Sequence, residues 1–179
     1  MRRLGFFLIA LLMAAPAQAT EAGWALLREG GHVVILRHAL SNGTIDPPNF
    51  DIEKCNTQRN LSERGKQQAK KIGALFATRA APVERVLSSR YCRTLETARL
   101  AFGDRVLEEF EPLDSANATS EKELILTEIR DFSGSGNMVL VTQIENINAL
   151  LDANAREGEA VIVRAEGEGL HVLGRIVFN

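Results

Sequence analysis

Short apolar runs alternate with helical patterns along this chain, and this alternation restricts its fold more than any other feature. The apolar runs predict strands at 32–37, 84–89, 137–142, 160–165 and 171–178. Helical patterns lie between them at 60–76, 92–102, 119–130 and 144–153. Alternating strands and helices favour right-handed crossovers, so we expect an α/β fold: a three-layer α/β/α sandwich around a mostly parallel sheet. The last two strands, joined by the glycine-rich "EGEG", are expected to form an antiparallel hairpin at the sheet edge.

The N-terminal segment has the features of a secretory signal. Arg2 and Arg3 give it a basic start, "LGFFLIALLMAA" is apolar, and "AQA" at 17–19 offers small residues for cleavage. We therefore expect a signal peptide over 1–19 and, after its cleavage, a single domain over 20–179 that is periplasmic or secreted. A membrane anchor is the alternative. The apolar run falls short of the roughly 20 residues that span a bilayer, so no stable membrane insertion is expected after cleavage.

The charge balance argues against nucleic acid as a partner. The chain has a net charge of −2, and loss of the two arginines of the signal makes this about −4. No run of basic residues is interleaved with aromatic residues, as an extended polyanion groove would need. Recognition of a phosphate must therefore depend on a few placed cations.

The chain has two cysteines, Cys55 and Cys92. One disulfide suits an exported protein, and two free thiols are the alternative. The sequence leaves both open, because it does not show whether the two Cα atoms approach within about 7 Å.

Polar residues follow the first three predicted strands, where each strand ends. The strand ends carry Arg37-His38, Ser88-Ser89 and Thr142-Gln143. The helix after the second of these strands has Arg93 in its first turn, where free backbone N–H groups favour an anion. Ligands of open α/β sheets bind beyond the carboxyl ends of the strands, and guanidinium groups bind phosphate oxygens in pairs. These residues therefore indicate a phosphate pocket; the alternative is that the arginines form surface ion pairs and that His38 is a core histidine.

The segment 40–59 is too long and too rich in turn residues to be an ordinary connection. Loops of this kind usually cover a site. We expect this loop to lie over the strand ends and to determine specificity.

Three blocks of sequence carry a family resemblance. They are "ILRHA", "NLSERGKQQAKKIGALF" and "VLSSRYCRTLETARLAFG", and they occur in this order within residues 30–151. They resemble the L-R-H-G, N/D-L-S/T-x-x-G-x-x-Q-A and S-S-x-x-x-R-x-x-x-T-A motifs of the histidine phosphatase superfamily, also called phosphoglycerate-mutase-like, with Ala39 in place of the usual glycine. The segment "CNTQRNLS" is similar to one found in a small exported branch of that superfamily.

The resemblance implies a phosphomonoester hydrolase in which His38 is the nucleophile and forms a phosphohistidine. Arg37 and Arg93 would hold the transferred phosphoryl group, and Ser88 and Gln143 would complete the phosphate site. It implies a small-molecule phosphoester or other phosphorylated ligand as the partner, with no metal and no organic cofactor. The chemistry agrees, because an imidazole nitrogen is nucleophilic near neutral pH and arginines stabilise charge on the equatorial oxygens.

The chain departs from the family at position 143. The superfamily has a second histidine there, whereas this chain reads "VLVTQIENINALL" with Gln143. The amide can donate a hydrogen bond to a phosphoryl oxygen, but it carries no charge and cannot titrate. We therefore expect impaired hydrolysis, and a pseudophosphatase that only binds a phosphorylated ligand is the alternative. A third interpretation is a structural exported protein with an empty pocket.

The family's reaction also needs a carboxylic acid that protonates the leaving oxygen. The stretch "VLEEFEPLDSANATS" supplies candidates, of which Asp114 is the first choice and Glu111 the second. No aromatic cluster or second basic patch in the sequence identifies a substrate. Few extra cations are available for a second phosphate, which favours hydrolysis over mutase activity.

Overall fold

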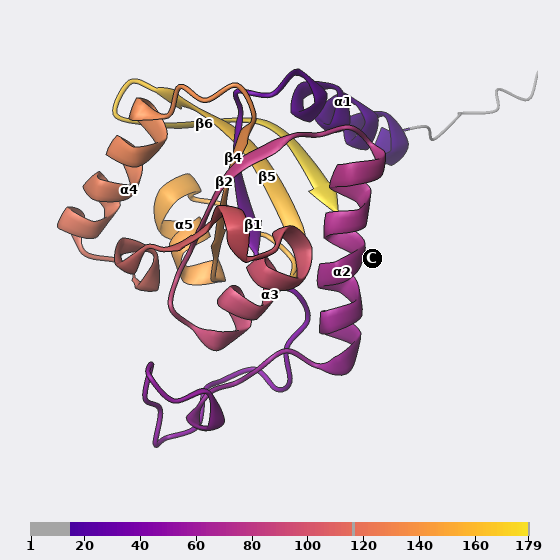
Figure 1. The fold of residues 1–179 in the computed structure, drawn as a ribbon. Helices are drawn as coiled ribbons and strands as arrows, with labels where there is room; N and C mark the ends of the chain where they lie inside the picture. The colour runs from indigo at the N-terminus through magenta and orange to yellow at the C-terminus, as the bar shows by residue number, and fades with distance from the viewer. Residues whose placement is uncertain (1–14, 116, 179) are drawn as a thin grey trace, which may run out of the picture.

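The computed structural model describes residues 15–115 and 117–178, and within them one sheet has the strand order β3-β2-β4-β1-β5-β6 (Figure 1). Its strands are β1 (Val33–Arg37), β2 (Val83–Ser88), β3 (Leu107–Glu109), β4 (Asn137–Thr142), β5 (Glu159–Glu166) and β6 (Gly169–Val177). β1, β2, β3 and β4 are parallel to one another, whereas β5 is antiparallel to β1 and β6 is antiparallel to β5. The predicted α/β fold, with its mostly parallel sheet and antiparallel edge hairpin, is confirmed.

Helices cover both faces of the sheet (Figure 1). They are α1 (Ala15–Glu29), α2 (Glu63–Thr78), α3 (Cys92–Phe102), α4 (Thr119–Asp131) and α5 (Ile144–Leu151), with short 3-10 turns at Cys55–Thr57, Asp104–Val106 and Glu111–Asp114. Side chains alternate along each strand, so Val34 and Leu36 pack with α1, α2 and α3, whereas Ile35 packs with α4 and α5. This alternation gives the sandwich two apolar cores.

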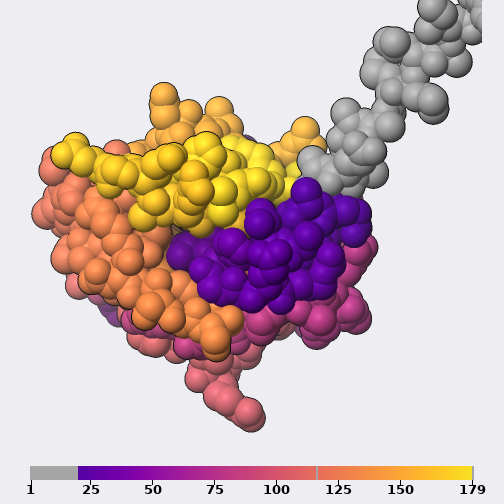
Figure 2. All heavy atoms as spheres, turned by 90° about the horizontal axis from the view of Figure 1, so that it is seen from above, coloured from indigo at the N-terminus to yellow at the C-terminus, as the bar shows by residue number. Residues whose placement is uncertain are grey.

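Two elements were not predicted. β3 has only three residues and includes two exposed glutamates, so it lacks the apolar run that indicates a strand. α1 begins within the predicted signal peptide, and no helix was predicted after that segment. The helix packs beside the C-terminal strand (Figure 2), where Trp24 lies edge-on to Phe76 and Phe178 at centroid distances of 5.4 and 6.0 Å.

The predicted signal peptide lies mostly outside the described residues. α1 begins at Ala15 and runs through the expected cleavage position. Among the described residues, no helix has the length and apolar character needed to cross a membrane.

The start of α2 fixes the return of the long loop after β1. Ser62 caps the helix, because its Oγ accepts a hydrogen bond from the Gly65 N–H at 3.0 Å. A Cβ at Gly65 would collide with the backbone carbonyl of Leu40. Only glycine allows the helix to pack this closely on the chain that leaves β1.

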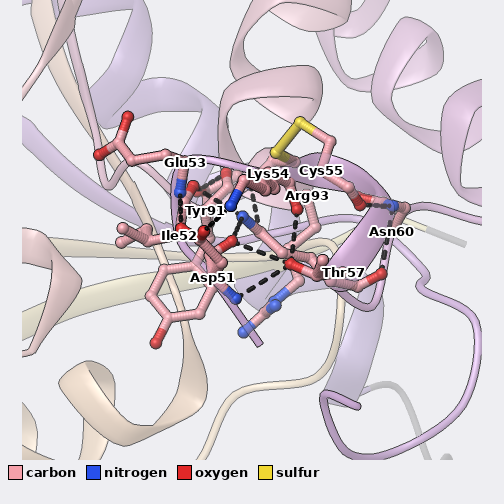
Figure 3. Close-up of a disulfide and its surroundings, with 12 residues drawn as sticks. Asp51, Ile52, Glu53, Lys54, Cys55, Thr57, Asn60, Tyr91 and Arg93 are labelled. Atoms are coloured by element: carbon pink, nitrogen blue, oxygen red, sulfur yellow. Dashed lines mark hydrogen bonds and ion pairs between the residues drawn. A yellow bond between two sulfur atoms is a disulfide. The ribbon is translucent and has the colours of Figure 1, made fainter. Parts of the chain in front are cut away.

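A disulfide joins the loop to the helix that carries Arg93 (Figure 3). The Cα atoms of Cys55 and Cys92 lie 5.6 Å apart, so the bridged alternative of the sequence analysis is confirmed. Gln58 strengthens the same connection. Its Nε2 donates to the backbone carbonyls of Asp51 and Ile52, and its Oε1 accepts from the Cys92 N–H at the start of α3.

Candidate active site

A cleft of about 340 Å³ lies beyond the carboxyl ends of β2 and β4, and we call it the strand-end cleft. Its walls come from the loop after β1, the start of α3, the segment after the 3-10 turn at Glu111–Asp114, and the start of α5. The lining residues are Thr44, Ile45, Asp46, Arg59, Tyr91, Arg93, Asp114, Ser115, Asn117, Gln143, Glu145 and Asn146. The loop therefore covers the strand ends, as its length and composition predicted.

His38 directly follows β1 and is fully buried. Its Nδ1 lies 2.8 Å from the backbone carbonyl oxygen of Ala39, and because a carbonyl can only accept, Nδ1 carries the proton. Nε2 then holds a lone pair, and this buried atom has no hydrogen-bond partner within the described chain. Burial lowers the pKa of His38 to about 3, although the Ala39 carbonyl opposes the shift, and Arg93, Arg37 and Arg59 lower it further. The imidazole is therefore a neutral base surrounded by three guanidinium groups.

Arg93 is 4% exposed and lies in the first turn of α3, as predicted. Its Nη1 donates to both carboxylate oxygens of Asp46, at 3.1 and 3.2 Å, and its guanidinium lies 4.4 Å from the centroid of the Tyr91 ring. Burial lowers the pKa of Arg93, while Asp46 raises it. Nε has no partner in the described structure. The arginine predicted to hold a phosphoryl group thus holds a carboxylate.

Arg59 is a further cation of the strand-end cleft that the sequence analysis did not select. Its Nη1 lies 3.9 Å from Glu157 Oε1, and its backbone N–H donates to Asp46 Oδ1 at 2.8 Å. Its Nε is buried, and no described group accepts from it. The signal for this residue was the "TQRN" of the segment before α2, which was interpreted only as a mark of resemblance.

Arg37 ends β1 and lines a second cleft rather than the strand-end cleft. Its Nη1 donates to the backbone carbonyl of Ala155 at 2.8 Å, and its Nε is buried without a partner among the described residues. Burial lowers the pKa of Arg37, and the neighbouring Glu157 opposes this. Arg37 and Arg93 both lower the pKa of His38, so both guanidinium groups lie near the imidazole although they line different clefts.

Ser88 and Gln143 have different positions. Ser88 is fully buried, its Oγ donates to the Ser89 carbonyl at 2.9 Å, and it does not line the strand-end cleft. Gln143 lines the cleft although it is only 3% exposed. Its Nε2 donates to Ser89 Oγ at 3.0 Å, and its Oε1 accepts from Thr142 Oγ1 and Asn146 Nδ2 at 3.0 and 3.2 Å. The amide is fixed in a buried polar network at the position predicted for the second histidine.

Three carboxylates line the strand-end cleft: Asp46, Asp114 and Glu145. Asp114 accepts from the backbone N–H and from Nε of Arg90, at 2.7 and 2.6 Å, so both of its oxygens are engaged. Glu111, the second choice for the proton donor, is exposed, pairs with Arg90 at 3.1 Å and is not among the residues that line the cleft. The sequence analysis did not consider Asp46 or Glu145.

Other motif residues position the site without lining the strand-end cleft. Thr97 Oγ1 accepts from the Ala39 N–H at 3.0 Å and donates to the Arg93 carbonyl at 2.7 Å, which connects β1 to α3. Gln68 Oε1 accepts from the Leu40 N–H at 2.9 Å, and its Nε2 donates to the carbonyls of Glu157 and Phe178. Within residues 15–115 and 117–178, no three His, Cys, Asp or Glu side chains gather as a metal-binding group.

Residues 33–114 match the model of the histidine phosphatase superfamily (branch 1), and this range contains His38, Arg93 and the α2 motif. The matched segment is similar to this superfamily, and the solved structures described below share the fold of the whole sheet. A search of curated proteins found no match.

Solved structures share the fold at low sequence identity. SixA from Agrobacterium tumefaciens is 21% identical, with a TM-score of 0.57 over 82% of this chain and 97% of that one. A mutant phosphoserine phosphatase from Entamoeba histolytica, in complex with phosphoserine, is 14% identical, with a TM-score of 0.60 over 80% and 95%. The protein histidine phosphatase SixA complexed with tungstate is 13% identical, with a TM-score of 0.59 over 82% and 96%.

Proposed function

We propose that this protein is an exported phosphomonoester hydrolase that forms a phosphohistidine at His38. The observation that carries the proposal is the state of the imidazole: it is neutral, its Nδ1–H is held by Ala39, and its Nε2 lone pair is unpartnered among three arginines. Solved proteins of the same fold were studied with phosphoserine and with tungstate, both of which are tetrahedral oxyanion ligands. A small phosphoester is therefore the expected substrate class.

The reaction proceeds in two displacements. Nε2 of His38 attacks phosphorus, the bond from phosphorus to the leaving oxygen breaks, and a carboxylic acid protonates that oxygen. Water then attacks the phosphohistidine, returns a proton to the carboxylate, and breaks the P–N bond to release phosphate. Arg93 and Arg59 offset the charge of the phosphoryl oxygens from the strand-end cleft, and Arg37 does so from β1.

Phosphoryl binding requires a rearrangement at Arg93. The Asp46 carboxylate already accepts from its Nη1 and has the same sign of charge as the phosphoryl group. The phosphoryl oxygens therefore displace Asp46 from Arg93. This exchange keeps the buried guanidinium paired in both states, which avoids the cost of an unpaired buried charge.

Asp114 remains our first choice for the proton donor because it lines the strand-end cleft. Asp46 and Glu145 line the same cleft and are tested beside it. The Asn variant of each aspartate and the Gln variant of Glu145 are compared with two substrates, p-nitrophenyl phosphate and an alkyl phosphate. Loss of the proton donor should slow the alkyl phosphate far more, because its leaving group is the stronger base.

The second candidate is a pseudophosphatase. Gln143 favours it, since a neutral amide bound to Ser89 replaces a group that can carry charge. Such a protein would bind phosphate through Arg93 and Arg59 without turnover.

The experiment that separates the two candidates is an assay of the purified protein against a panel of phosphomonoesters, with His38→Ala as the blank. Slow turnover that disappears in the blank supports the hydrolase. Phosphate binding that depends on Arg93, without turnover and without a phosphorylated His38, would replace it with the pseudophosphatase.

Export remains part of the proposal. The basic and apolar start of the chain suggests it, and a disulfide such as Cys55–Cys92 is stable mainly in oxidising compartments. Fractionation of cells that produce the protein, followed by mass measurement of the mature chain, tests both the location and cleavage after Ala19.

A further inference from the structure

A second cleft of about 530 Å³ lies beside the site, and we call it the basic cleft. It is larger than the strand-end cleft. Its walls come from the end of β1, the first half of α2 and the segment before β5. The lining residues are Arg37, Leu40, Arg64, Gln67, Gln68, Lys71, Arg156 and Glu157.

The cleft has an excess of positive charge. Four of its lining side chains are cations, at Arg37, Arg64, Lys71 and Arg156, and one is a carboxylate, at Glu157. That carboxylate is already engaged, because its Oε1 accepts from Ser41 Oγ at 2.6 Å and lies 3.9 Å from Arg59 Nη1. With four cations and one carboxylate, the lining of the cleft has a net positive charge.

The spacing of the residues on α2 places them on one exposed face of the helix. Arg64, Gln67 and Lys71 are three and four residues apart, which aligns them along the helix, and all three are exposed. They offer charged and amide donors in a row beside Arg37. Donors of this kind suit phosphate or carboxylate oxygens.

Glu157 connects the basic cleft to the site around His38. It lines the basic cleft, and its Oε1 lies 3.8 Å from His38 Nδ1 and 3.9 Å from Nη1 of Arg59, which lines the strand-end cleft. His38 itself is fully buried and is not among the residues that line either cleft. The basic cleft therefore adjoins the strand-end cleft, from which the ligand's phosphoryl group would reach His38.

We propose that the basic cleft binds a second anionic group of the ligand whose phosphoryl group is bound at His38. The inference rests on the proposed function and names its substrate class: a small molecule with two anionic groups, such as a bisphosphorylated compound.

Binding is measured by calorimetry on the protein with His38→Ala, so that no turnover occurs. The probes are alkanediol bisphosphates of two to six carbons and the matching monophosphates, which differ only in the second phosphate. We expect at least one bisphosphate to bind about tenfold more tightly than its monophosphate. Equal affinities at every chain length would overturn the proposal.

A triple variant tests the residues. Arg64→Gln, Lys71→Gln and Arg156→Gln together should remove the preference for the bisphosphate and leave the monophosphate affinity within about twofold. The matched control, Lys70→Gln, Arg99→Gln and Arg105→Gln, removes the same charge outside both clefts and should keep the preference. If the control variant loses the preference for the bisphosphate equally, the preference depends on the net charge of the protein and not on the basic cleft. The assignment of the second anionic group to the basic cleft would then be wrong.

The two proposals fail separately. If the bisphosphate preference depends on the triple set and on Arg93 although the unsubstituted protein shows no turnover, the basic cleft stands and the hydrolase proposal falls. If turnover occurs without any such preference, the hydrolase stands and the basic cleft has been misassigned.

Discussion

Glu157 lines the basic cleft and lies 3.9 Å from Arg59 of the strand-end cleft, but the two clefts hold their cations in different ways. In the strand-end cleft, Arg93 is buried and already paired with Asp46. In the basic cleft, Arg64 and Arg156 are exposed. A buried cation is costly unless it is paired, so it needs a fixed partner before the ligand arrives. Exposed cations need none, and they are suited to attract and hold the rest of a ligand.

Removal of the disulfide should separate the two clefts most clearly, because the bridge joins the loop and the helix α3 that line the strand-end cleft. Replacement of Cys55 and Cys92 by serine should lower the free energy of unfolding by about 4 kcal/mol, since the bridge closes a long chain segment across a sequence separation of 37. Denaturant unfolding measures this. The variant should lose phosphate affinity at Arg93 and keep the bisphosphate preference of the basic cleft. Unchanged unfolding would show that the bridge does not constrain the loop.

The second prediction concerns Gln143. Loss of a hydrogen-bond donor that stabilises charge in the transition state lowers the rate by a factor on the order of 10²–10³. Gln143→His should therefore raise kcat by about 10², while the affinity for phosphate changes less. Steady-state kinetics with p-nitrophenyl phosphate checks this, and Asn148→His, on the exposed side of α5, is the control. If the folded variant binds phosphate but has no activity, the defect lies beyond position 143.

The sequence predicted the strand-end cleft better than the basic cleft. His38, Arg93 and Gln143 each follow a strand or begin a helix, and the carboxyl ends of neighbouring parallel strands meet at one edge. Arg37 and Arg156 are far apart in the sequence and become neighbours only through the tertiary fold. The sequence showed no second basic patch, since no local pattern reveals a cluster that the tertiary fold assembles.

Details of the polar contacts were also beyond the sequence. Ser88 and Ser89 are adjacent and chemically equal, yet only Ser89 contacts Gln143, because successive side chains of a strand point to opposite faces. Asp46 belongs to a loop whose path is fixed by the disulfide and Gln58. Its pairing with Arg93 needs that path to be known.

The third prediction compares single cations of the site and the surface. Arg93→Ala should weaken phosphate binding by about 1.5–3 kcal/mol, because a charge-assisted contact in a buried site is lost. Lys66→Ala and Lys70→Ala should leave it nearly unchanged, since charges outside the site are screened by solvent. Calorimetric titration with inorganic phosphate measures all three. Equal losses would place the anion site elsewhere.

The smallest effect is the pH dependence of stability that arises from His38. Its folded pKa is lowered to about 3 from 6.5, so below pH 6.5 the unfolded chain binds more protons and stability is lost as the pH falls toward 3. This group should remove about 1 kcal/mol between pH 6.5 and 5.5. His38→Asn, whose amide can still donate to the Ala39 carbonyl, should lack that part of the slope. Parallel unfolding curves for the two proteins would mean that His38 is not held neutral.

The central claim is that His38 becomes phosphorylated through its Nε2. The protein is mixed with a phosphomonoester, quenched in alkali, digested, and analysed by mass spectrometry under conditions that preserve phosphohistidine. The account predicts a single phosphorylated residue, His38, with the phosphoryl group attached to Nε2. Arg90→Ala removes the arginine that holds Asp114, so more of the phosphohistidine should accumulate in that variant. A protein that hydrolyses the substrate with an unmodified His38, or one phosphorylated at another residue, would contradict it.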